Sequence, residues 1–155
     1  MSETKLVKTC REVLEVELLG VFLWKVCDRM TGGIPDVFIG WNGATTMIEF
    51  KYLKKDETVH QKWEDGRQLV TCVKLEGVTG RCWVVAYQKK CQWREHDQTI
   101  IYRPTALLDL KTPKPSVMGY RVGEQWAARL WDEGCVIMQG FDHRAIASLI
   151  RQTHR

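Results

Sequence analysis

Two short runs, Pro35-Asp36 and Glu49-Phe50-Lys51, contain the side chains whose types and spacing point most clearly to chemistry. Twelve residues separate Asp36 from Glu49, and the Asn42-Gly43 pair among them is a strong signal for a two-residue β-hairpin turn. Pairing back along the ladder from that turn puts Asp36 directly opposite Glu49, with Cβ atoms about 4.5–5.5 Å apart. Two carboxylates at this separation repel each other, and a divalent cation is the simplest group that would offset the repulsion.

Residues 44–51 read as the second strand of this hairpin, and their alternation puts Met47, Glu49 and Lys51 on one face. Mg²⁺ prefers oxygen ligands and needs only one or two carboxylates from the protein, so Asp36 and Glu49 suffice. Lys51 would then orient a water molecule or offset charge on a phosphate. Two alternatives stay open: the charged residues are the solvated side of an amphipathic strand, or a three-residue loop shifts the register and moves Asp36 to the other face.

The run from Trp24-Lys25 through Gly33-Ile34-Pro35-Asp36, followed by Ile48-Glu49-Phe50-Lys51 and then Gln61, resembles the PD-(D/E)xK nuclease superfamily. The likeness spans about residues 3–88 and is strongest to the small VRR-NUC type nucleases, which include stand-alone phage and bacterial proteins and are related to Holliday junction resolvases. A bare PD followed by ExK is a weak pattern. The flanking residues and Gln61 make it more specific.

This resemblance implies roles for individual side chains. Asp36, Glu49 and the backbone carbonyl of Phe50 would bind Mg²⁺, with Mn²⁺ as a substitute. Lys51 would assist the attacking water, and Gln61 would complete the catalytic set.

The family also has an acidic residue on its first helix, and Glu3 is the matching position. The helical pattern of residues 3–19 agrees, because Glu3 falls on the apolar stripe near the helix start. Ser2 is placed to cap this helix, and an acid in the first turn also suits the helix dipole whatever its function. Glu12 and Glu15 are weaker alternatives, and Glu17 shares the stripe about three turns away.

The activity implied by the resemblance is that of a Mg²⁺-dependent endodeoxyribonuclease, a phosphodiesterase that acts on branched or junction DNA. The alternative is a catalytically inactive nuclease-fold module that binds DNA or protein. Five basic residues are candidates for DNA contacts: Lys25, Arg29, Lys54, Arg144 and Arg151. The last two belong to a basic end of the chain with His154 and Arg155, although charged ends are commonly just solvated.

Small members of the superfamily often act as homodimers, so a dimer through the C-terminal helices or a sheet edge is expected. The net charge of +4 permits nucleic-acid binding without requiring it. No window approaches 18 uninterrupted apolar residues and no signal-peptide pattern begins the chain, so a cytoplasmic protein is expected (host cytoplasm if phage-encoded). The six cysteines lack close pairing and are expected to be free thiols.

The 155 residues are expected to form a single nuclease-like domain, residues 1–155, with a core over about 3–103 and a C-terminal helical extension over about 116–155. The predicted fold is α/β: a restriction-endonuclease-like mixed sheet flanked by helices. Its predicted elements are a helix at 3–19, a strand at 21–27, the hairpin, a helix at 60–75, strands at 81–87 and 99–102, a helical turn at 104–110, and helices near 121–133 and 142–152.

Four of the tryptophans have a predicted position. Trp24 and Trp83 lie in strand patterns and are expected in the core. Trp41 and Trp63 are candidates for surfaces that stack on a base, with core packing as the alternative.

Overall fold

The computed structural model describes residues 2–26, 33–54, 57–62, 67–108, 116–118 and 125–154. Arg29, Trp63 and Arg155 lie outside these ranges, as do the side chains of His60 and Gln61. The helices are α1 (Glu3–Glu17), α2 (Arg67–Thr79), α3 (Ala128–Glu133) and α4 (His143–Thr153), with 3-10 turns η1 (Val59–Lys62) and η2 (Pro104–Leu107). The strands are β1 (Phe22–Lys25), β2 (Val37–Trp41), β3 (Ala44–Leu53), β4 (Cys82–Gln88), β5 (Gln98–Tyr102), β6 (Ser116–Met118) and β7 (Cys135–Gln139).

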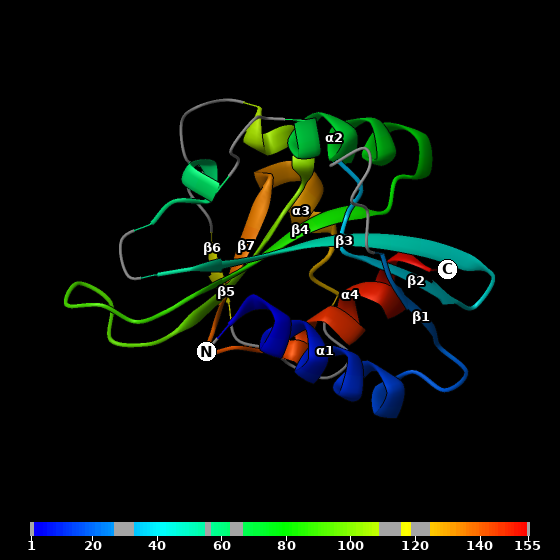
Figure 1. Ribbon diagram of the computed structural model, residues 1–155, viewed down its shortest axis with the longest axis horizontal. Coiled ribbons are helices and arrows are strands. Elements are labelled where there is room, and N and C mark those ends of the chain that lie inside the picture. Colours follow the sequence, from blue (N-terminus) through cyan, green and yellow to red (C-terminus); the bar gives the residue numbers. More distant parts are fainter. Residues whose placement is uncertain are drawn as a thin grey trace.

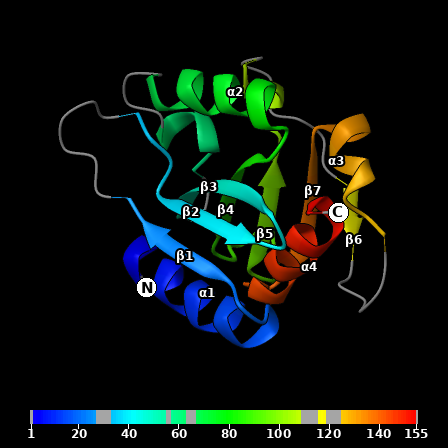
Figure 2. The same cartoon turned by 90° about the vertical axis from the view of Figure 1, so that its right-hand side faces the viewer.

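One mixed sheet of seven strands, in the order β1-β2-β3-β4-β5-β7-β6, runs through these ranges. The first three strands are antiparallel neighbours, and β4 then pairs parallel to β3 after the α2 crossover. Helices α1 and α4 pack together on one face of the sheet, and α2 covers β3 and β4 on the other (Figures 1 and 2). The predicted α/β class with a mixed, helix-flanked sheet is therefore confirmed.

Each face of the sheet has its own apolar core. On the α1 and α4 side, Leu14, Phe50 and Trp83 are fully buried. On the α2 side the corresponding core contains Val84 and Ala86 of the central strand β4. Because every side chain of β4 is buried, its continuous apolar run is that of a strand covered on both faces.

The hairpin forms around the predicted turn. Asn42 and Gly43 both have positive φ, 51° and 75°, as a two-residue type I′ turn requires. Trp41 then pairs with Ala44, and the register runs back to Val37 opposite Ile48. The three-residue loop is excluded, so the face assignment of Glu49 and Lys51 holds.

The last helix clasps this hairpin turn through His154, which is buried. Its Nδ1 lies 2.7 Å from the carbonyl oxygen of Trp41, and its Nε2 is hydrogen-bonded to the hydroxyl of Thr46. Asn42 Nδ2 donates to the carbonyl of His154 at 3.0 Å. A carbonyl only accepts, so Nδ1 carries the proton and Nε2 accepts from Thr46. Burial lowers the pKa of His154, which agrees with a neutral ring.

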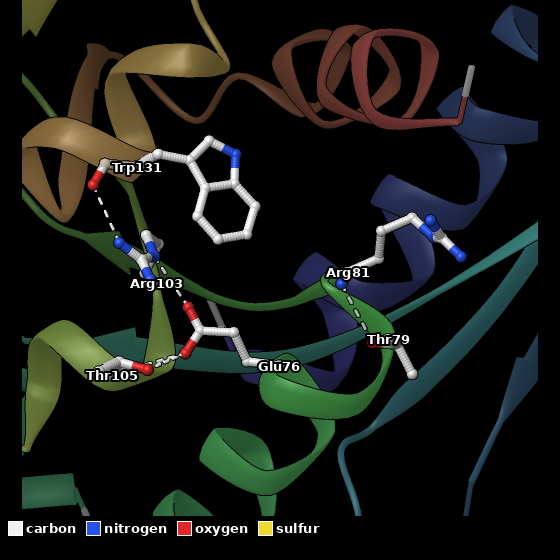
Figure 3. Close-up of polar contacts among 6 residues, drawn as sticks. All are labelled: Glu76, Thr79, Arg81, Arg103, Thr105 and Trp131. Carbon is white, nitrogen blue, oxygen red and sulfur yellow. Dashed lines mark hydrogen bonds and ion pairs between the residues drawn. The ribbon is translucent and has the colours of Figure 1, made fainter.

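Helix α2 is anchored by the buried carboxylate of Glu76 (Figure 3). Arg103 Nε donates to Glu76 Oε1 at 2.9 Å, and the backbone N–H and hydroxyl of Thr105 both donate to Oε2. Arg103 also donates to the carbonyl of Trp131 and lies over its ring, 4.5 Å from the centroid. A glutamate with both oxygens satisfied thus fixes α2 to η2 and α3.

Three element predictions need correction. The C-terminal extension, predicted as two helices near 121–133 and 142–152, also contains the strands β6 and β7. Strand β7 has four apolar residues followed by Gln139. It is bounded by Gly134, which ends α3, and by Gly140, and both glycines have positive φ. Of the predicted helix at 60–75, the described residues belong to the 3-10 turn η1 and to α2, and α2 continues to Thr79.

Trp24 is the third correction. It is 61% exposed, because β1 is an edge strand and α2 does not extend over it, whereas Trp83 is buried as expected.

Among the described residues, no helix has the length and apolar content that crossing a membrane requires.

Candidate functional site

Asp36 lies where β2 begins and the edge of β3 becomes open. The paired register ends at Val37 and Ile48, so Asp36 stands beside Glu49, one step further along. Its backbone carbonyl accepts from Val26, which continues the pairing toward β1. Its side chain turns to the open edge of β3, where Oδ2 accepts the backbone N–H of Phe50 at 2.9 Å. The Asp36 carboxylate thus accepts a hydrogen bond that a backbone carbonyl would accept if β2 extended one residue further toward its N-terminus.

The hydrogen bond to Phe50 also orients a backbone carbonyl. The N–H and C=O of one strand residue point to the same edge, so the Phe50 carbonyl leaves β3 on the side of Asp36. This is the direction in which a ligand shared between Asp36 and Phe50 would lie.

Glu49 and Lys51 project from β3 toward α2. Lys51 Nζ lies 2.7 Å from Glu49 Oε1 and donates to Gln68 Oε1 at 2.8 Å. Glu49 is only 1% exposed, and its second oxygen, Oε2, is buried without a hydrogen-bond partner among the described residues. A buried carboxylate oxygen without a donor is costly, and it marks a position where a cation or a proton would be favourable.

The acids of this site hold their protons unusually tightly. The pKa of Glu49 is raised to about 8, first by burial and then by the neighbouring Asp36, while Lys51 acts in the opposite direction. Burial also raises the pKa of Asp36, against the lowering effects of the Phe50 N–H and the charges of Lys51 and Lys25. Without a cation, Glu49 is therefore largely protonated at neutral pH.

Glu3 reaches the same strand from the opposite face. Ser2 caps α1 as predicted, accepting from the N–H of Lys5. From the first turn, Glu3 Oε2 accepts the backbone N–H of Tyr52 at 3.2 Å, and its pKa is raised first by burial and then by Asp36. The alternatives lie elsewhere: Glu12 and Glu15 are exposed, and Glu17 is at the far end of the helix.

The glutamine beside Lys51 is Gln68, in the first turn of α2, and sequence reasoning missed it. Gln61 lies in η1, and its side chain is outside the described residues, so its predicted role remains a prediction. Gln68 is seven residues further on, which is two helical turns if one continuous helix is assumed. The available signal was therefore a second glutamine on the same expected helical stripe.

The predicted DNA contacts have separate locations. Lys25 is exposed at the end of β1, and its charge reaches Asp36. Lys54 is exposed just after β3. Arg144 and Arg151 both pair with Glu17, at 3.4 and 3.1 Å, and so tie α4 to the end of α1. That end is roughly 20 Å along the helix from Glu3. His154 is buried, so it does not belong to a basic surface.

The donor set suits a small hard cation. Within the described residues, no three His, Cys, Asp or Glu side chains converge closely enough to form a ready-made metal cluster. Mg²⁺ typically takes one or two carboxylates and keeps several waters, so Asp36, Oε2 of Glu49 and the Phe50 carbonyl are compatible with it.

Comparisons with protein-family models, with curated proteins and with solved structures found no match for this chain. The PD-(D/E)xK assignment therefore depends on the motif and on the arrangement of its residues.

Proposed function

We propose that this protein is a metal-dependent endonuclease that hydrolyses phosphodiester bonds of DNA. The observation that carries the proposal is the buried Oε2 of Glu49, which has no hydrogen-bond partner among the described residues, next to Asp36 and with the Lys51 ammonium on the same face. Two opposed acids and a lysine in one place are unfavourable for folding, as the raised pKa values of both acids indicate. Arrangements of this kind are typical of sites that bind a charged ligand.

Asp36, Glu49 and the Phe50 carbonyl would hold the cation. When bound, Mg²⁺ supplies Lewis-acid stabilisation of phosphate charge and lowers the pKa of a coordinated water. Its binding would also displace the proton of Glu49, because a carboxylate binds the cation only when ionised. This predicts that metal affinity rises with pH up to about 8.

Lys51 is placed to act on the substrate. Its Nζ touches Glu49 and Gln68, so the ammonium is held at a fixed position beside the carboxylate pair. When the Glu49 carboxylate binds a cation, the Lys51 ammonium would be able to donate to a phosphate oxygen or to the attacking water. Gln68 keeps the ammonium in place and is therefore a positioning residue.

Cleavage of supercoiled plasmid and of labelled duplex, flap, fork and four-way-junction DNA tests the proposal, with Mg²⁺ or Mn²⁺ and with EDTA. We expect cation-dependent nicking or cleavage, its loss in Asp36→Ala, and its retention in the matched control Asp132→Ala, an exposed aspartate on α3. Equal cleavage by wild type and Asp36→Ala would show that the site is wrongly assigned. DNA binding without turnover under either metal would favour the alternative of an inactive binding module.

A homodimer belongs to the same proposal, because two symmetry-related sites would cut two strands. Light scattering at the concentration of the cleavage assay tests it, and a strict monomer would contradict it.

A further inference from the structure

Two large aromatic side chains of the edge strand β1 face solvent. Phe22 is 60% exposed and Trp24 is 61% exposed. Leu23, between them, points to the other face, where it helps to line a slot against α1. Figure 2 shows β1 at the free edge of the sheet, beside α1 and well apart from α2. Neighbouring exposed rings on an edge strand favour association with another molecule.

The register places these rings on the face that carries the candidate site. Trp24 pairs with Phe38, and Phe38 pairs with Met47, so these three side chains form a row across β1, β2 and β3. Met47, Glu49 and Lys51 alternate along β3 and share that face. Phe38 and Met47 are only partly buried, so the row stays accessible. Trp24 is two strands across and two residues along from Glu49, which corresponds to roughly 12 Å.

Basic residues of α2 lie beside the chain that leads into β2. Thr71 of α2 packs against Gly33, where an added Cβ would lie 2.9 Å from the Thr71 hydroxyl. The stripe of α2 that contains Thr71 therefore faces the chain leading into β2. Arg67 and Lys74 are one turn away on either side along this stripe, and both are exposed. Lys25 follows Trp24 on β1, but its side chain alternates to the opposite face with Leu23 and lines the slot against α1, so it is not part of the aromatic face.

Exposed rings on a sheet face, with the basic residues Arg67 and Lys74 on the helix that packs on the same face, match the chemistry of unpaired nucleic acid. Bases stack on aromatic rings whatever their sequence, and phosphates follow the positive charges. An apolar protein segment would use the rings but not the cations. A duplex would use the cations but would keep its bases stacked inside.

We propose that Phe22, Trp24 and Phe38 bind the unpaired bases of a single-stranded segment that flanks the phosphate held at Asp36 and Glu49. The proposal rests on the proposed function only for the position of that phosphate. As a consequence, the preferred substrate carries a single-stranded stretch, such as a flap or a fork, in preference to a continuous duplex.

Fluorescence anisotropy with a short labelled oligothymidylate, in EDTA so that no cleavage occurs, tests base stacking directly. We expect Trp24→Ala to weaken binding about fivefold to a hundredfold, the range that loss of one stacked base gives. Trp24→Tyr should restore most of the affinity, whereas Trp24→Leu, which keeps apolar surface without a ring system, should not. Trp93→Ala is the matched control, because Trp93 is 81% exposed on the loop between β4 and β5.

The outcomes separate this inference from the proposed function. Binding that depends on Trp24, in a protein that cleaves no DNA, would support the stacking surface and contradict the nuclease. A second outcome would overturn the stacking surface alone. In it, the wild type cleaves DNA, and Trp24→Ala and Phe22→Ala match the wild type in oligothymidylate binding and in preference for flaps. Absence of oligothymidylate binding by wild type would also overturn it. So would light scattering that shows Trp24→Ala dissociating a dimer without changing oligonucleotide affinity.

Discussion

Replacement of Glu49 by Gln is expected to stabilise the protein at neutral and alkaline pH. The side chain keeps its size, but the charge that burial and Asp36 oppose is removed. A group whose pKa is raised in the folded state binds its proton more tightly there, so ionisation costs folding free energy as pH rises above the unfolded value. The wild-type penalty should therefore be absent below pH 4.5, grow up to about pH 8, and then stay constant.

The difference between the ordinary pKa of 4.5 and the raised pKa of about 8 sets the upper bound of the gain in unfolding free energy. At about 1.4 kcal/mol for each pH unit, it corresponds to about 5 kcal/mol. Part of this is offset because Lys51, also buried, loses its carboxylate partner and keeps only Gln68 among the contacts described above. We expect a net gain of about 1–3 kcal/mol at pH 8 and close to zero at pH 5, or several degrees in Tm.

Urea denaturation of both proteins at pH 5, 6, 7 and 8 measures this difference. Glu76→Gln is the matched control, since Glu76 is a buried glutamate whose oxygens are satisfied by Arg103 and Thr105. It should destabilise by about 2–4 kcal/mol at pH 8. Saturating Mg²⁺ should narrow the gap between wild type and Glu49→Gln, because cation binding stabilises the ionised wild type. A Glu49→Gln variant less stable than wild type at pH 8, or a gap that does not change with pH, would refute the reasoning.

Three further changes follow from the same contacts. Asp36→Ala should lose about 1 kcal/mol of stability with the Phe50 hydrogen bond, whereas Asp36→Asn should keep the bond and lose only cleavage; melting curves and plasmid nicking measure the two effects. Gln68→Leu should reduce kcat about tenfold or more with little change in Mg²⁺ affinity, and equal kcat would remove Gln68 from its positioning role. Burial lowers the pKa of His154, so wild-type stability should decline as pH falls below 6.5, and His154→Asn should show a smaller decline in acid denaturation.

The parts of this molecule that sequence could predict are governed by local chemistry. Asn42-Gly43 specifies one turn type, and the turn type specifies the register that brings Asp36 beside Glu49. Ser2 and the apolar stripe of α1 likewise determined that Glu3 would lie near the sheet. In each case a few neighbouring residues contain the necessary information.

The parts that sequence missed depend on contacts between distant segments. The contact of Gln68 with Lys51 depends on where α2 lies, and α2 is positioned by Arg103 and Thr105. Trp24 has the pattern of a buried strand residue, yet its exposure follows from the position of β1 at the sheet edge. A short apolar run such as that of β7 is compatible with either a helix or a strand until its partner β5 is known.

The clasp between His154 and the hairpin turn has a consequence for the order of folding during synthesis. The hairpin that brings Asp36 to Glu49 leaves the ribosome early, but the imidazole that satisfies Trp41 and Thr46 is made more than a hundred residues later. Contacts of such sequence separation are slow to form, because a long loop must close before they stabilise anything. A nascent chain that ends before α4 would therefore hold both acids on a loosely closed hairpin, and the candidate site would mature only when the end of the chain arrives.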